Sequence, residues 1–237
     1  MKLISSVTVI CLLAIATMAQ EKPVAITAEG HHQLVLENEY TRVFHVVVPS
    51  KQSTLMHAHE LDYVSVQIGA ADFTNEKVGS APAEVKLDDG AVKFAKGGFA
   101  HKITILSDAP FENLTIEVKK PSTKAICGAS WPGVLAESPK ACESERATGV
   151  IGEASNVRTD AVEVHTYFVA GSGTNFAVHD EENPRLLVAL TKLSCRCGGA
   201  KALEMMRGDV TWVPKGTLAT LSKAGAEDPK WVTVAFK

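Results

Sequence analysis

The chain has 237 residues, of which 46% are hydrophobic, 22% charged and 6% aromatic, and its formal net charge is −3. This is the composition of an ordinary globular protein, and the length allows one large β domain or two barrels of roughly 100 residues each. A weakly negative chain offers no cationic surface, which argues against nucleic acid and anionic lipid as partners.

Residues 1–19 have the order of a secretory signal peptide. Lys2 precedes an apolar run from Leu3 to Ala16, and small residues follow as far as Ala19. The run is shorter than the roughly 20 apolar residues that span a bilayer, and no later run is long enough, so no stable membrane span is expected. We therefore expect cleavage near Gln20 and a secreted or periplasmic protein.

Four cysteines follow the expected cleavage site, at positions 127, 142, 195 and 197. An even number in an exported chain favours disulfides over catalytic thiols. Cys127 and Cys142 would close a loop in the most irregular part of the chain, whereas Cys195 and Cys197 could pair with each other only under strain. Three connectivities remain open, and a four-thiolate zinc site is the less favoured alternative because the spacings are not those of a zinc ribbon.

The chain nearly repeats itself at an offset of about 120 residues. The stretch from Arg42 to His59 aligns with that from Glu163 to His179, and the stretch from Gly90 to His101 aligns with that from Gly208 to Ala219. The simplest explanation is two copies of one fold.

Each copy consists of short segments with alternating apolar residues, such as Val64, Val66 and Ile68, separated by turn-forming residues. This pattern predicts β-strands and an all-β fold. We expect the first copy over residues 20–120 and the second over residues 156–237. Between them, residues 121–155 are rich in Pro, Gly, Ser and Ala, which predicts a linker that carries a cysteine pair.

His57 and His59 flank Ala58 in a segment expected to be extended. Side chains two residues apart on a strand project from the same face, so both imidazoles can converge on one metal ion. Two surface histidines on an edge strand are the alternative. Glu60 is expected to face the opposite side, toward solvent.

The downstream segment GAVKFAKGGFAH places Gly90, Gly98 and His101 at a fixed spacing. Together with His57 and His59, this spacing resembles the cupin superfamily. The first cupin motif is a His-x-His pair followed by a carboxylate and a glycine, and the second is G-x5-P-x-G-x2-H.

The sequence departs from the cupin motifs at two positions. Lys96 stands where the family usually has proline, and Asp62, seven residues before the closing Gly69, stands where it has glutamate, after a shorter loop. The resemblance extends from about Leu34 to Phe236. It implies two double-stranded β-helix barrels, which are also called jelly-roll or cupin barrels.

The resemblance also implies one divalent transition metal, namely iron, manganese, zinc or nickel, bound in the first barrel by His57, His59 and His101. Asp62 is a candidate fourth ligand, and a water molecule is the alternative. The second copy has Ala177 and Ala219 in place of two of the histidines, and is therefore expected to have lost the site. His31 and His32, near the expected mature N-terminus, are expected to be exposed.

Three neutral histidines leave coordination positions open, as catalytic metal sites do. We therefore expect a metal-dependent enzyme that acts on a small oxygen-rich substrate, of the dioxygenase, isomerase or decarboxylase type found among cupins. The alternative is a non-catalytic exported protein that binds a small ligand or the metal itself. Tyr63, Lys96 and Lys102 are the nearest candidates for proton transfer. A homo-oligomer is compatible with the sequence.

Overall fold

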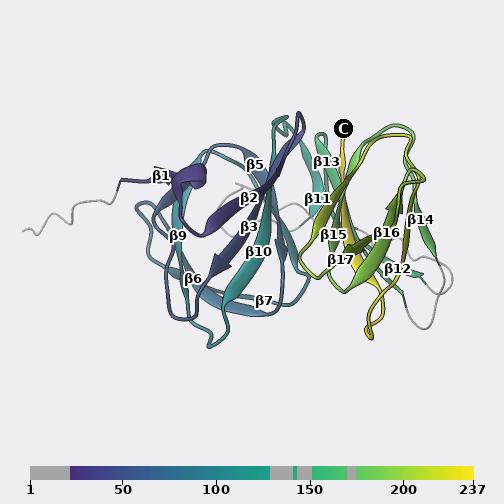
Figure 1. Cartoon of the computed structure of the whole chain (residues 1–237). Helices are drawn as coiled ribbons and strands as arrows, with labels where there is room; N and C mark the ends of the chain where they lie inside the picture. Colours follow the sequence, from purple (N-terminus) through teal and green to yellow (C-terminus); the bar gives the residue numbers. More distant parts are fainter. Residues whose placement is uncertain (1–21, 129–140, 143–150, 170–174) are drawn as a thin grey trace, which may run out of the picture.

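The structure is a computed structural model that describes residues 22–128, 141–142, 151–169 and 175–237. The expected signal peptide therefore lies outside the described residues. Figure 1 shows two β-barrels side by side, the first built from strands β1 to β10 and the second from β11 to β20. Among the described residues, no helix is long and apolar enough to cross a membrane.

The first barrel consists of two five-stranded sheets, which we call sheet A and sheet B. Sheet A has the order β1 (Val24–Ala25), β4 (His57–His59), β9 (Phe99–Ile105), β6 (Ala71–Lys77) and β7 (Ala83–Leu87). Sheet B has the order β2 (His32–Glu37), β3 (Thr41–Val48), β10 (Phe111–Val118), β5 (Asp62–Gln67) and β8 (Val92–Ala95). A short 3-10 helix, η1 (Ile26–Ala28), links β1 to β2.

The second barrel consists of sheet C, with six strands, and sheet D, with four. Sheet C has the order β11 (Ala125–Gly128), β12 (Ile151–Thr159), β13 (Val162–Val169), β20 (Lys230–Phe236), β15 (Arg185–Ala189) and β18 (Val210–Val213). Sheet D has the order β14 (Phe176–Val178), β19 (Ala219–Lys223), β16 (Leu193–Cys197) and β17 (Leu203–Met205). Strand β11 and the first residues of β12 lie within residues 121–155, the stretch expected from the sequence to be a linker.

The two barrels have equivalent central strands, as the sequence repeat predicts. In sheet B, β10 pairs with β3 on one side and β5 on the other; in sheet C, β20 pairs in the same way with β13 and β15. All of these pairings are antiparallel. The prediction of an all-β fold with two jelly-roll barrels is therefore confirmed.

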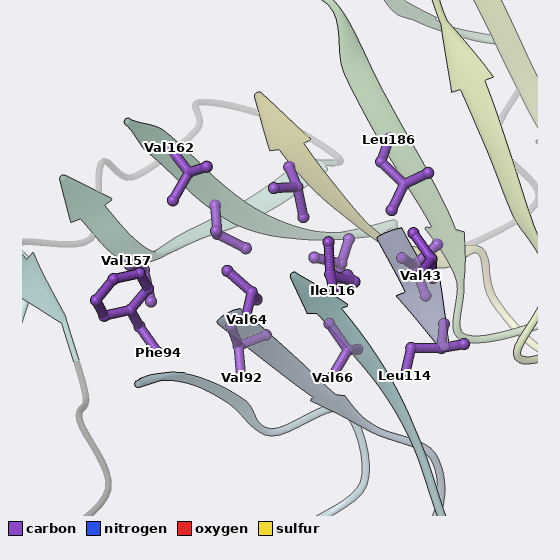
Figure 2. Packing of buried hydrophobic residues seen from close by; sticks show 14 of the residues in the cluster. Val43, Val64, Val66, Val92, Phe94, Leu114, Ile116, Val157, Val162 and Leu186 are labelled. Atoms are coloured by element: carbon purple, nitrogen blue, oxygen red, sulfur yellow. The ribbon is translucent and has the colours of Figure 1, made fainter. Parts of the chain in front are cut away.

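The alternation of apolar residues along the strands of the four sheets fills three cores. One lies inside the first barrel, around Phe44 and Phe73, and one inside the second, around Leu193 and Leu221. The third lies between the barrels. It is formed by side chains on the face of each sheet that points out of its own barrel, including Val64, Leu114, Ile116, Val162, Leu186 and Val234. Figure 2 shows these side chains meeting between strands of the two sheets. The second barrel therefore packs against the first along an apolar layer.

Cys127 and Cys142 form a disulfide, with their Cα atoms 4.9 Å apart. This is the pairing that would close the irregular loop. The other two cysteines, Cys195 and Cys197, are free thiols on strand β16.

Candidate metal centre

Strand pairing in sheet A brings three of the predicted ligands together. β4 and β9 are antiparallel, and His57 lies directly opposite His101 in their register. Directly opposite residues on paired strands share one face of the sheet, and so do residues two apart on one strand. His57, His59 and His101 therefore all project from the same face of sheet A, into the first barrel.

The three imidazoles are buried and in contact with one another. Their exposed fractions are 1% for His57, 2% for His59 and 5% for His101. Nε2 of His59 lies 3.0 Å from Nε2 of His101, and the ring centroids of His57 and His101 are 4.6 Å apart. The fold thus brings His57 and His59, which are neighbours in the sequence, into contact with His101, which lies 42 residues beyond His59.

A fourth histidine completes the cluster, and its position corrects an expectation from the sequence. The His32 side chain is only 4% exposed, and its ring centroid is 4.7 Å from that of His57. One ring nitrogen from each of His32, His57 and His59 lies within 4.8 Å of the other two. His32 reaches the barrel interior because it begins β2 opposite Val46, a residue that also lines the cavity.

Three of the imidazoles are held by an acceptor at Nδ1. Nδ1 of His57 lies 2.9 Å from the carbonyl oxygen of Leu55, and Nδ1 of His101 lies 2.8 Å from Oδ1 of Asn75. Nδ1 of His32 lies 2.6 Å from a carboxylate oxygen of Glu29. Because these oxygens can only accept, each Nδ1 carries the proton and donates, and each Nε2 keeps its lone pair. Metal-bound histidines are oriented by the same kind of partner.

Within the histidine cluster, two buried ring nitrogens have no hydrogen-bond partner: Nε2 of His57 and Nδ1 of His59. An unpaired buried polar atom is destabilising and calls for an explanation, which a bound ion would supply for the Nε2 lone pair of His57. The 3.0 Å separation of the His59 and His101 Nε2 atoms also fits. Two nitrogens about 2.1 Å from one ion, at an angle of about 90°, lie roughly 3.0 Å apart. The residues present therefore suit a transition metal ion.

Burial keeps His57, His59 and His101 uncharged at neutral pH. Desolvation, with the nearby His32 as a second cause, lowers the pKa of His57 from 6.5 to about 4. Desolvation followed by the repulsion of neighbouring imidazoles also lowers the pKa values of His59 and His101. For Glu29, burial raises the pKa, but hydrogen bonds from His32 and from backbone N–H groups outweigh it and bring the pKa to about 2. The site thus presents neutral imidazoles, the form that binds a metal, and one buried carboxylate.

The four histidines line a small cavity inside the first barrel. Its volume is about 20 Å³, which is room for one or two water-sized species. Tyr63, Asn113 and Thr115 contribute polar side chains to the wall, and Phe111 contributes an apolar one. The Tyr63 ring stacks on His59 with the ring centroids 4.4 Å apart, and burial raises the pKa of its hydroxyl. The Tyr63 hydroxyl therefore stays protonated and can donate a hydrogen bond into the cavity.

The structure turns Asp62 away from this cavity. Along β5, Tyr63 faces the barrel interior, so the preceding Asp62 faces the opposite side. One carboxylate oxygen accepts hydrogen bonds from Lys96 Nζ and the Ser122 N–H, both at 2.8 Å, and the other accepts from the Gly97 N–H at 3.0 Å. Asp62 therefore connects two loops and does not join the imidazoles at the cavity.

The two lysines considered for proton transfer also have other partners. Lys96 is bound to Asp62, and Lys102 forms an ion pair with Glu76 at 3.2 Å. Neither lysine lines the cavity. Of the three candidates named from the sequence, Tyr63 alone faces it.

The equivalent place in the second barrel lacks the cluster. β14 and β19 are antiparallel, as β4 and β9 are, but the register differs by one residue from the sequence alignment: Val178, and not Ala177, lies opposite Ala219, and Ala177 lies opposite Thr220. His179 is 38% exposed at its side chain and lies 3.5 Å from the Glu181 carboxylate. Within the described residues, the histidine cluster is therefore confined to the first barrel.

No family model matches the sequence, and no curated protein matches it either. Among solved structures, AerE from Microcystis aeruginosa superposes with a TM-score of 0.62 at 11% identity, covering 88% of this chain and 98% of that protein. Salicylate 1,2-dioxygenase from Pseudaminobacter salicylatoxidans gives a TM-score of 0.61 at 11% identity, covering 86% and 75%.

A cupin 2 conserved barrel domain protein from Leptotrichia buccalis gives a TM-score of 0.54 at 11% identity, covering 87% of this chain and 88% of that protein. At such low identity these similarities concern the fold alone. They agree with the two barrels and the repeated strand order described above. The chain therefore has the cupin fold in its two-barrel form.

Proposed function

We propose that this protein is an exported metal-binding cupin whose first barrel holds one divalent transition metal on His57, His59 and His101, with His32 as a fourth ligand. The observation that carries the proposal is the convergence of four imidazoles on one cavity, three of them oriented through Nδ1. A hydrophobic core of the same size would need none of these polar groups. Their burial without a full set of partners is explained when they bind an ion.

The ligand set narrows the choice of metal. Imidazole nitrogen suits iron, zinc, nickel and copper, whereas manganese prefers carboxylate and other oxygen ligands. Because the Asp62 carboxylate faces away from the cavity, an all-nitrogen site favours iron, zinc or nickel over manganese. A bound ion of this kind would act as a Lewis acid toward an oxygen ligand, or would activate O2 if it is iron.

We propose an enzyme acting on a small oxygen-rich substrate. The chain's own contribution is to hold the substrate beside the imidazoles, to donate a hydrogen bond from Tyr63 and to exclude bulk water with Phe111 and Val46. The salicylate dioxygenase has also been solved in complex with gentisate. Such a ring exceeds the present cavity of about 20 Å³, so we expect a substrate much smaller than gentisate.

The same small volume favours a second candidate, which is capture of the metal itself without turnover. A catalytic centre needs an open coordination position, whereas a storage site does not. Cobalt(II) substitution distinguishes the two, because the visible spectrum of cobalt(II) reports its coordination. Adding azide to the cobalt protein should change the spectrum if a position is open. An unchanged spectrum would favour the metal-binding protein.

Metal content tests the site itself. Protein purified without added metal should contain one ion per chain, and His57→Ala should lose it because one of the converging nitrogens is removed. His179→Ala is the matched control, since it removes an exposed imidazole of the second barrel and should leave the content unchanged. Retention of the ion by His57→Ala at unchanged affinity would overturn the assignment. Far-ultraviolet circular dichroism checks that both variants remain folded.

Export is part of the proposal and is supported by the order of residues 1–19. Sequencing of the mature protein from its own cell should begin near Gln20. An intact Met1 on a cytosolic product would contradict export without affecting the metal site.

A further inference from the structure

The second barrel carries two thiols at the place that corresponds to the edge of the histidine cluster. In sheet A, β6 pairs with β9 so that Lys77 lies opposite His101. In sheet D, β16 pairs with β19 in the same way, and Cys197 lies opposite Ala219, the counterpart of His101. Cys195 accordingly takes the place of Asn75, the residue that holds His101 in the first barrel.

The two sulfur atoms are already close. Sγ of Cys195 and Sγ of Cys197 are 3.1 Å apart. Cys195 is 1% exposed and belongs to the core of the second barrel, while Cys197 packs at its edge and is partly exposed. A reagent in solution can therefore reach Cys197 directly, and Cys195 only through Cys197.

We propose that Cys195 and Cys197 form a redox-labile disulfide within the chain, made and broken by exchange with small-molecule disulfides such as oxidised glutathione. The proposal is independent of the metal site. In the first step the Cys197 thiolate attacks one sulfur of oxidised glutathione, which breaks that disulfide and releases one glutathione thiolate. In the second step Cys195 loses its proton to solvent and attacks Cys197 Sγ, releasing the second glutathione thiolate. One disulfide is consumed and one is formed.

The order of the two steps follows from the surroundings of each sulfur. Burial, together with the neighbouring Cys197, raises the pKa of Cys195 to about 12. A thiol of this kind is a poor first nucleophile, because exchange requires the thiolate. Once Cys197 carries glutathione, the short distance to Cys195 Sγ favours the intramolecular attack.

The disulfide should be labile because forming it strains strand β16. Residues two apart on an extended strand have Cα atoms about 6.6 Å apart, close to the upper limit of about 6.8 Å for disulfides. Closing the bond requires the end of β16 to bend. Gly198 and Gly199 follow directly, with φ angles of 57° and 79°, and form the turn in which this movement can occur. Strained disulfides have higher reduction potentials and are the ones that exchange.

Peptide mapping provides the test, because Arg196 lies between the two cysteines. The native protein is equilibrated in glutathione buffers of different ratios, its free thiols are blocked in acid-quenched samples, and it is digested with trypsin. Cleavage after Arg196 should give peptides 193–196 and 197–201 joined by a disulfide. The pair should be half reduced at a value of [GSH]²/[GSSG] at least tenfold lower than Cys127–Cys142 requires, where GSH and GSSG are reduced and oxidised glutathione; this tenfold difference corresponds to about 30 mV.

Two serine variants test the order of the steps. Cys195→Ser should accumulate a mixed disulfide of Cys197 with glutathione, whereas Cys197→Ser should leave Cys195 unmodified. Non-reducing electrophoresis should show a monomer throughout. Joined peptides from a covalent dimer, equal modification of both variants, or unlinked thiols in fully oxidised glutathione would each overturn the proposal.

Discussion

Lowering the pH should destabilise the metal-free protein through the buried imidazole of His57. Its pKa is about 4 in the folded state against 6.5 when unfolded, so the unfolded chain binds the additional proton throughout this interval. The contribution to stability is complete above pH 6.5 and is lost as the pH falls toward 4. Each tenfold difference in proton affinity is worth about 1.4 kcal/mol, which gives about 3 kcal/mol in full and about 2 kcal/mol by pH 5.

Urea unfolding followed by circular dichroism, with a chelator present, measures this loss directly. The free energy of unfolding should be at least about 2 kcal/mol lower at pH 5 than at pH 7, because His59 and His101 act in the same direction. His57→Gln cannot titrate and should reduce the difference, while His179→Gln should not. Equal free energies of unfolding at pH 5 and pH 7 would refute the assignment of buried neutral imidazoles.

Three further changes have distinct expected outcomes. Asp62→Ala should leave the metal content unchanged and lower the free energy of unfolding by about 3 kcal/mol, because two backbone N–H groups and a lysine lose their acceptor. Metal analysis and urea unfolding measure the two effects, and a loss of metal would show that Asp62 is a ligand. Glu29→Gln should weaken metal binding about 10- to 100-fold, since His32 loses a carboxylate that orients it. Competition with a chelator measures the affinity, and an unchanged affinity would exclude His32 as a metal ligand. Leu114→Ala should lower the free energy of unfolding by about 2–5 kcal/mol without changing the metal content, because the cavity it leaves lies between the barrels. Thermal and urea unfolding measure the loss of stability, and a loss of metal would show that metal binding depends on the packing between the barrels.

The repeat and the strand pattern were sufficient to predict two copies of an all-β fold, and the resemblance to cupins implied that each copy is a jelly-roll barrel. Strand alternation also placed His57 and His59 on one face. These features can be predicted without a structure because the strand period and the repeat length are properties of the sequence itself.

The remaining residues of the site depended on long-range pairing. His32 enters the cavity through the register of β2 with β3, which no spacing in the sequence reveals; the one local signal is Glu29, three residues earlier. Asp62 occupies the motif position of a carboxylate, yet it lies one residue before the inward-facing Tyr63 on β5 and therefore faces away from the cavity. A change of one residue in strand phase moves a side chain to the other side of a sheet.

The apolar layer between the barrels has a consequence for the ancestry and dissection of the chain. Sheets B and C meet through equivalent central strands, so each half presents to the other the kind of surface through which identical subunits associate. The two barrels are in this sense arranged like the two subunits of a dimer, but they are joined in a single chain. A single half produced alone would expose that surface to water, and pairing with a second copy of itself would be the nearest substitute for the missing half.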